Sequence, residues 1–341
     1  MCDAICRATP AGFPELNTKE PACPASISSA TSTVMPTPWR RCSRSSATAS
    51  ARASTATPKG AASSSSATSS TCGPHQERVL RLARGMCDDG HARAVMGNHE
   101  YNAVCFATRD PVHPGNHLRP HTDKNVRQHQ RFLGQMDSWL EAWSRTHLEW
   151  VDWFRTLPLW LETDGLRAIH ACWHPGHQRT LAPYLDEGNR LTGEGFVATS
   201  RKDTPEYEAL ETLLKGLEVR LPEGCSFRDK DGHERHEVRV RWWADRSMTY
   251  PEGAILEEAR AQLPHESMPE AARLGYPGDK PVFVGHYWMQ GDPAPMAPQV
   301  ACLDYSIAKE GKLCAYRWDG EPELSADNFV WVAEGHTPRR E

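Results

Sequence analysis

The first part of the chain has almost no acidic side chains. No Asp or Glu occurs between residues 21 and 76, where Ser, Ala, Thr, Pro and Arg dominate. Such a composition cannot bury enough apolar surface to offset the loss of chain entropy. We therefore expect residues 1–72 to be an aberrant, low-complexity and disordered segment, and residues 73–341 to form one domain whose N-terminal part is incomplete.

Three other features are missing, and each excludes a class of protein. No apolar run approaches the roughly 20 residues that cross a bilayer, so no membrane partner is expected. A net charge of -5 gives no reason to expect nucleic acid. The 11 cysteines are odd in number and contain no CxxC pair, which argues against a disulfide framework or zinc ribbon and favours reduced thiols in the cytoplasm.

The acid-free stretch has three competing explanations: a disordered linker, a transit peptide, or a coding segment read in the wrong frame. The genetic code favours the third. In a shifted frame, codons for residues 29–42 (SATSTVMPTPWRRC) can spell GDIHGHADALEALL. Codons for residues 63–71 (SSSSATSST) can spell VFLGDFID, and loss of one base within Cys72 rejoins the written frame as GDFIDRGP. Two coherent motifs in order are hard to obtain by accident.

The strongest motif in the written frame is AVMGNHE, residues 94–100. The apolar run Ala94–Met96 predicts a strand, and Gly97 permits a tight turn after it. Asn98 and His99 would then project from the carboxyl end of the strand. An amide oxygen is a hard ligand for a divalent metal, and a neighbouring imidazole can supply a proton.

Two more histidines follow predicted strands. His170 ends the run Leu166–Ile169, and His286 follows Gly285 in PVFVGHYW, residues 281–288. His174 and His177 lie close to the first of these, so they remain alternatives to it as ligands.

The order GDxHG, GDxxDRG, GNHE, a strand-end His and a final GH resembles the calcineurin-like metallophosphoesterases. Within them it is similar to the branch of Ser/Thr phosphoprotein phosphatases and symmetrical diadenosine tetraphosphatases. The written match runs from Gly73 to about Asp304, and the two earliest motifs exist only in the shifted frame. The resemblance implies an α/β sandwich of two mixed β-sheets flanked by helices.

The resemblance also implies roles for individual residues. Asn98, His170 and His286 correspond to metal ligands, and His99 corresponds to the proton donor for the leaving oxygen. The cofactors would be two divalent ions such as Mn, Fe or Zn. The substrate would be a small phosphorylated molecule, such as a nucleotide polyphosphate, or a phosphoprotein. With neither GxxxxGK[ST] nor GxGxxG in the sequence, a nucleotide would bind as substrate and not on a P-loop.

Two arginines are candidate phosphate-binding residues. Arg119 lies in the polar stretch that follows GNHE, and Arg241 lies in the alternating segment Arg239–Trp243. A solvent-facing loop is the competing interpretation of the first.

The written chain departs from the family at its start. The Asp-x-His pair, the bridging Asp and the DRG Arg have no written counterparts, and two cations need anionic oxygens around them. We therefore expect this polypeptide to be inactive or nearly so. Two alternatives stay open: a non-catalytic relic or binding module with the same fold, and a one-metal site of Asn98, His170 and His286.

Periodicity predicts four further elements. Spacings of three and four between apolar residues predict helices over residues 137–160 and 206–221. Residues 233–237 (HERHE) have the wrong spacing for a metalloprotease motif and predict a polar hairpin. Residues 300–306 and 312–318 predict a closing hairpin.

Overall fold

The structure is a computed structural model with a mixed α/β fold, as the sequence predicts. It describes residues 33–35, 75–140, 142–229, 232–276 and 278–333. The expected disorder of residues 1–72 and both shifted-frame motifs therefore lie outside the described residues, apart from the three residues of strand β1.

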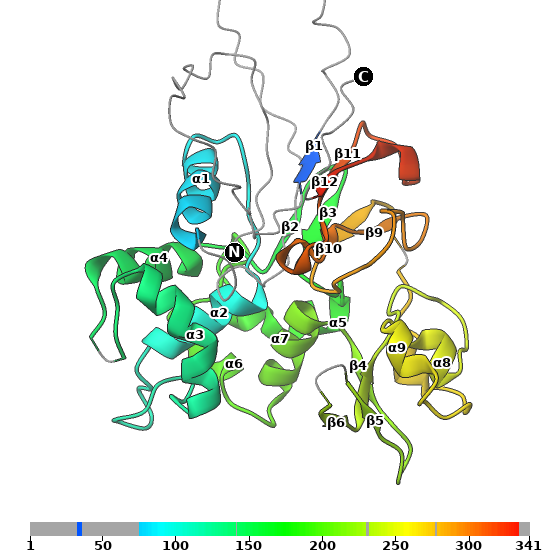
Figure 1. Cartoon of the computed structure of the whole chain (residues 1–341), viewed down its shortest axis with the longest axis horizontal. Helices are drawn as coiled ribbons and strands as arrows, with labels where there is room; N and C mark the ends of the chain where they lie inside the picture. The colour runs from blue at the N-terminus through cyan, green and yellow to red at the C-terminus, as the bar shows by residue number, and fades with distance from the viewer. Residues whose placement is uncertain (1–32, 36–74, 141, 230–231, 277, 334–341) are drawn as a thin grey trace, which may run out of the picture.

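Two four-stranded sheets form the centre of the molecule (Figure 1). In the first, β3, β8 and β9 are parallel and β2 is an antiparallel edge strand. In the second, β11 pairs with β10, β12 and β1, of which only β1 is parallel to it. The strands of the first sheet are β2 (Trp160–Glu162), β3 (Arg167–Ile169), β8 (Val282–Val284) and β9 (Val300–Cys302). Those of the second are β1 (Thr33–Met35), β10 (Asp304–Tyr305), β11 (Lys312–Arg317) and β12 (Phe329–Ala333).

The two sheets contact each other through one buried cluster. Ala168, Phe283 and Ala301 of the first sheet meet Cys314 and Tyr316 of the second, and the Phe283 and Tyr316 rings lie 5.3 Å apart. The alternate residues of the first sheet belong to a larger cluster shared with the helices. The first sheet is thus covered on both faces, which explains why its strands are short apolar runs rather than alternating ones.

Helices α1–α7 gather on one side of the first sheet, whereas α8 and α9 lie beyond β4 and β5 (Figure 1). Helix α2 packs against α4 and α7, and α5 packs against α7. The helices are α1 (Gln76–Asp88), α2 (Asn98–Ala107), α3 (Asp123–Gln135), α4 (Arg145–Arg155), α5 (Pro175–Leu181), α6 (Gly193–Thr199), α7 (Pro205–Lys215), α8 (Tyr250–Gly253) and α9 (Glu257–Arg260).

Two small hairpin-like sheets and four single turns complete the described fold. The pairs are β4 (Glu218–Arg220) with β7 (Glu237–Arg239), and β5 (Phe227–Arg228) with β6 (Glu234–Arg235). The 3-10 turns are η2 (Ala182–Tyr184), η3 (Glu270–Ala272), η4 (Ile307–Lys309) and η5 (Ala326–Asn328). The polar hairpin expected over residues 233–237 is confirmed as part of β5–β6 and β7. The closing hairpin is confirmed for β10–β11, but its first strand divides, since β9 belongs to the other sheet.

Helix α4 begins later than periodicity predicts, and helix α7 ends earlier. Helix α4 begins only after Ser144, whose hydroxyl accepts the His147 N–H at 3.0 Å and caps the helix. Trp139, expected on its buried face, is 74% exposed. Helix α7 ends at Gly216, whose φ of 94° breaks the helix before the last predicted turn.

The strand predicted for Ala94–Met96 is wrong. These residues are buried but have no strand structure. Within the described residues, one backbone hydrogen bond joins this segment to a distant part of the chain, from the Met96 N–H to the Pro158 carbonyl at 2.7 Å. A single bond is too few for a β-ladder.

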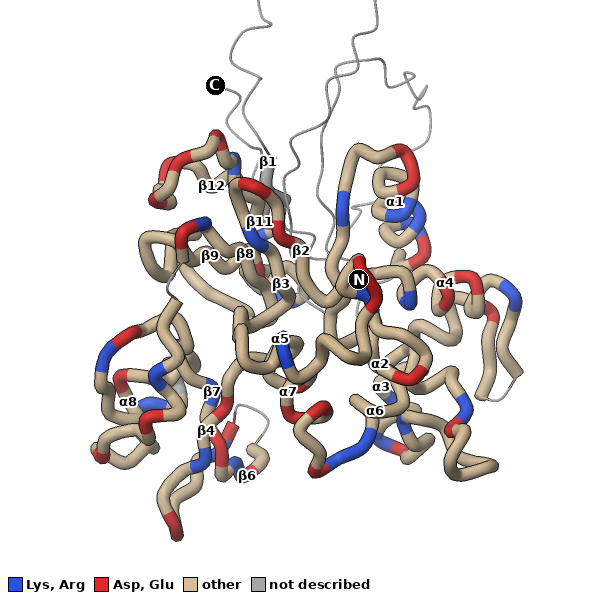
Figure 2. The backbone as a smooth tube through the Cα atoms, turned by 180° about the vertical axis from the view of Figure 1, so that it is seen from behind, with Lys and Arg blue, Asp and Glu red and all other residues tan. Residues whose placement is uncertain are grey.

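Charges of both signs alternate along the described trace (Figure 2). Among the described helices, none is both long and apolar enough to cross a membrane. The six cysteines of the described part are free thiols.

Candidate functional site

The two strand-end histidines lie at the same edge of the first sheet. His170 directly follows β3, and His286 follows β8 after one glycine. Because β3 and β8 are parallel neighbours, their carboxyl ends coincide. The Gly285 N–H donates to the His170 carbonyl at 2.9 Å and fixes the two ends together. The rings of His170 and His286 meet edge to face at 5.2 Å.

Asn98 reaches the same place from the first residue of α2. Its Oδ1 accepts a hydrogen bond from the His170 Nε2 at 3.1 Å. Gly97 caps the helix, and its N–H donates to the Glu100 carboxylate at 3.2 Å. A Cβ on Gly97 would lie 2.6 Å from that carboxylate and 3.0 Å from the His170 ring, so only glycine permits this approach.

His286 carries an unsatisfied ring nitrogen. Its Nδ1 is buried and has no hydrogen-bond partner within the described part of the chain. Leaving such an atom unpaired costs about 1–3 kcal/mol, which a bound cation or proton donor would recover. The chemistry of the donor set, one amide oxygen and two imidazoles, suits a single divalent transition ion.

Burial keeps the imidazoles neutral. It lowers the pKa of His170 to about 3 and holds the pKa of His99 and His286 well below the usual range. Neighbouring His129, His170 and Arg119 lower the pKa of His99 further. Neutral imidazoles are the form that binds a metal. A neutral His99, however, is a poor proton donor, so the role expected for it needs an acidic partner.

The four expected residues therefore gather at one point, although Asn98 and His170 are far apart in sequence. His174 and His177 do not join them, because His174 Nδ1 accepts the His177 N–H at 3.2 Å and caps α5. His170, by contrast, contacts both Asn98 and the His286 ring, which favours it over these two histidines as the ligand.

The two arginines have different surroundings. Arg119 lies near His99, and its guanidinium donates to Asn102 at 3.0 Å and Gln128 at 2.7 Å. Arg241 instead lines a separate cavity next to Trp243. The phosphate-binding role expected for Arg241 stays a prediction, and the structure places this residue at that cavity.

Arg239 is the arginine that lies near His286. Of the charged groups that lower the pKa of His286, it has the largest effect after burial. Its Nε is buried and has no hydrogen-bond partner among the described residues, and its Nη2 donates to Glu218 at 2.7 Å. Local pattern could not distinguish the two arginines, because Arg239 and Arg241 alternate with the same period.

In the part of the chain that the structure describes, the buried carboxylates near this site are already engaged. Among the described residues, no group of three or more His, Cys, Asp or Glu has an arrangement that would hold a metal ion. The buried acids have other partners: Glu100 caps α2, and Asp304 accepts the backbone N–H groups of Trp288 and Ser306, both at 3.1 Å. The Asp-x-His pair and the bridging Asp of the resembled family have no counterparts in the written sequence of residues 21–76, which contains no Asp or Glu.

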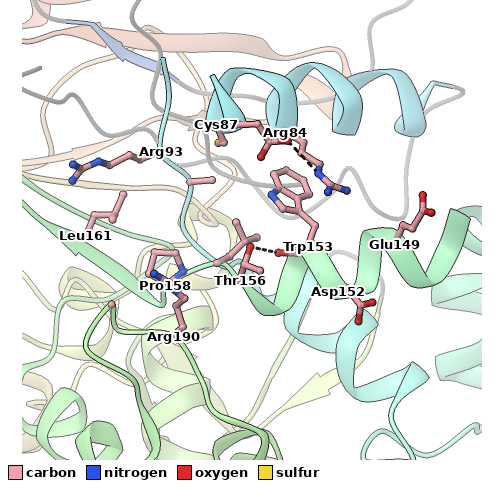
Figure 3. Close-up of a pocket in the computed structure, with 14 residues that line it drawn as sticks. Arg84, Cys87, Arg93, Glu149, Asp152, Trp153, Thr156, Pro158, Leu161 and Arg190 are labelled. Atoms are coloured by element: carbon pink, nitrogen blue, oxygen red, sulfur yellow. Dashed lines mark hydrogen bonds and ion pairs between the residues drawn. The ribbon is translucent and has the colours of Figure 1, made fainter. Parts of the chain in front are cut away.

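A large cavity lies elsewhere in the described part of the chain, but it does not include the candidate site residues. It has a volume of about 1050 Å³, and Arg84, Arg93, Trp153 and Arg190 line it (Figure 3). It opens beside Ala94, at the start of the buried segment whose far end leads to Asn98. None of the four gathered residues lines it, so we place the candidate site by chemistry and not by size.

No protein-family model matches this chain, and a search of curated proteins finds no match either.

Proposed function

We propose that this chain derives from the calcineurin-like metallophosphoesterases and has their sandwich architecture. Two mixed four-stranded sheets in contact, with helices covering the outer face of one, support this proposal. So do ligand-type side chains at the carboxyl ends of β3 and β8. The free thiols of the described part agree with a reducing compartment such as the cytoplasm.

The proposed activity is hydrolysis of a phosphate ester or anhydride, in a nucleotide polyphosphate or a phosphoprotein. The observation that carries it is the meeting of Asn98 Oδ1 and His170 Nε2 at 3.1 Å beside the unpartnered Nδ1 of His286. Two ligand atoms of one ion, each about 2.1 Å from it, lie about 3 Å apart.

The residues of this chain have separable roles in that activity. Two divalent ions, when bound, supply positive charge for the phosphate and lower the pKa of water. Asn98 and His170 would hold one ion from two sides, and His286 would complete its imidazole ligands. Arg119 supplies a fixed positive charge beside His99. The described donors fit one ion, whereas the second requires the carboxylates of the shifted-frame motifs.

The written chain is therefore an impaired phosphoesterase in this proposal. A specific observation favours the alternative of a non-catalytic relic: His99 has a strongly lowered pKa, and no carboxylate is among the groups that affect it in the described part. Without a proton donor or a bridging anion, slow turnover is expected even with metal present.

The deciding experiment compares the written chain with a chain in which the frame is restored between residues 29 and 72. Both are assayed for p-nitrophenyl phosphate hydrolysis with manganese, and their metal content is measured by mass spectrometry. We expect turnover and two ions in the restored chain, and near-zero turnover in the written one. The proposal fails if the restored chain binds no metal. His177→Ala in the restored chain serves as a control that should keep activity.

A further inference from the structure

A second cavity begins one residue after His286. It has a volume of about 610 Å³, within the range of roughly 300–1,000 Å³ typical of small-molecule sites. Four segments line it: the loop after β8, the residues after β7, helix α9 and the β10–β11 connection. Its lining includes Arg241, Trp243, Trp288, Tyr305 and Lys309.

Tyr287 connects this cavity to the histidines. Its ring lies 6.0 Å from that of His286 and 6.2 Å from that of Trp243. Its hydroxyl accepts the Trp242 Nε1–H and donates to the Ala171 carbonyl, each at 2.8 Å. The wall of the cavity and the candidate metal ligands therefore share one fixed side chain.

The loop that carries Trp288 is held in an unusual conformation. His286 and Trp288 have φ angles of 69° and 53°, a left-handed region that non-glycine residues rarely adopt. The Asp304 carboxylate accepts the Trp288 N–H and the Ser306 N–H, so one buried acid fixes both loops that border the cavity. Such strain persists where surrounding contacts enforce it, and it clusters at ligand sites.

Cationic side chains outnumber acidic ones in the lining of this cavity, with Arg241, Arg260, Lys309 and Lys312 against Glu257 and Asp292. Within the described residues, the half-buried guanidinium of Arg241 has neither an ion pair nor a hydrogen bond. The two acids of the lining are already engaged: Glu257 pairs with Arg260 at 3.3 Å, and Asp292 pairs with Lys312 at 2.7 Å. An arginine in this state is a ready partner for an anion, and its planar fork matches phosphate.

The same cavity presents aromatic surfaces. Trp243 and Trp288 are half-buried, so part of each indole faces the cavity. The Lys309 ammonium lies 4.2 Å from the centre of the Trp288 ring. Flat aromatic ligands stack on such rings with a gain of about 1–3 kcal/mol per stacked base in nucleic-acid complexes.

We propose that this cavity binds an aromatic ring that carries a phosphate group. The ring packs against the indoles, and the phosphate pairs with Arg241. Its role as a subsite for one end of the substrate rests on the proposed function, because it borders His286. The binding itself requires no metal, so the two ideas can be tested apart.

The test is calorimetric titration of the full chain in EDTA with four probes: adenosine monophosphate, O-phosphotyrosine, adenosine and inorganic phosphate. We expect at least one aromatic phosphate to bind with a Kd below about 1 mM. Adenosine and inorganic phosphate should bind about tenfold more weakly, because each lacks one of the two contacts. The tighter aromatic phosphate identifies the source as a nucleotide or a phosphorylated tyrosine.

Two substitutions locate the binding. Arg241→Gln should weaken the aromatic phosphate about tenfold and leave adenosine unchanged. Arg246→Gln is the matched control, since this exposed arginine of the same segment does not line the cavity. Trp243→Leu should weaken both adenosine and the aromatic phosphate. Thermal unfolding of each variant verifies that it is folded.

Several outcomes would overturn the proposal: no binding of either aromatic phosphate, equal binding of inorganic phosphate, or equal effects of Arg241→Gln and Arg246→Gln. Binding of adenosine monophosphate, together with no metal binding by the frame-restored chain, would keep the cavity proposal and reject the phosphoesterase proposal. Metal binding without binding of either aromatic phosphate would reject the cavity proposal and keep the phosphoesterase proposal.

Discussion

The Nε2 atom of His170 lies 3.1 Å from the Oδ1 atom of Asn98, although 72 residues separate the two in the chain. Both atoms are of the kinds that ligate divalent metals, and their separation suits a shared ion. This contact makes the metal-binding proposal testable without any assay of turnover.

Metal should stabilise the chain through His170. With manganese or zinc at about one hundred times its Kd, the stabilisation is about 2.7 kcal/mol, or about 5 °C in Tm. His170→Ala should abolish this rise, whereas His177→Ala should keep it because His177 belongs to the α5 cap. Calorimetric melting with and without metal measures both, and an unchanged rise in His170→Ala would contradict the site.

Gly97→Ala should destabilise the fold. The added Cβ would lie 2.6 Å from the Glu100 carboxylate and 3.0 Å from the His170 ring, and such overpacking costs about 1–3 kcal/mol. Gly85→Ala is the matched control. It lies within α1 with open space around its Cβ position, so it should stabilise by up to about 1 kcal/mol. Urea unfolding of both variants gives the comparison, and equal midpoints would refute the close approach.

Stability should fall as the pH falls below neutrality. Burial lowers the pKa of His129 and His170 to about 3 and that of His147 to about 4. Since these bases take up protons more readily when unfolded, their contribution is complete above the unfolded pKa of about 6.5 and is lost progressively toward the folded values. Each costs up to about 1.4 kcal/mol per pH unit in that window.

The substitution His147→Phe removes one of these three titrating histidines. The His147 Nδ1 is buried without a partner in the described part, and its ring packs edge to face with Phe132, so a phenyl ring should fit. The variant should have a shallower dependence of unfolding free energy on pH between 7 and 5, measured by urea unfolding at several pH values. A slope equal to that of the parent would show that His147 is not the group that titrates.

Arg239 and Arg241 should affect His286 differently. Arg239→Gln removes a positive charge that lowers the pKa of His286, so this pKa should rise. Arg241→Gln should leave the pKa of His286 unchanged, since the Arg241 side chain lines the second cavity. Histidine ring signals followed by NMR across pH report both, and the opposite ranking would reverse the assignment of the two arginines.

Part of this site was predictable from local pattern alone. The apolar runs before His170 and His286 are short and end in polar or glycine residues, so they read as buried strands, and β3 and β8 are found there. That the two strands are neighbours is a long-range fact no local pattern contains. The position of Asn98 beside the two histidines depends on the same long-range arrangement. It was predicted only through the family resemblance.

The failures have physical causes in particular residues. Ala94–Met96 reads as a strand, but a strand requires a partner, and Met96 finds only the Pro158 carbonyl among the described residues. Trp139 fits the helical period, but the Ser144 cap sets the start of α4 after it. Arg241 shares a period with Arg239, but β7 ends at Arg239, so alternation alone could not place the Arg241 side chain at the second cavity.

The left-handed backbone at His286 and Trp288 has a consequence for engineering. Glycine or asparagine at either position should raise thermal stability, because these residues adopt the left-handed conformation with little strain. Substitution at both positions would remove an imidazole and an indole together. A variant selected for thermal stability is therefore expected to lose binding first at the turn between the histidines and the aromatic cavity.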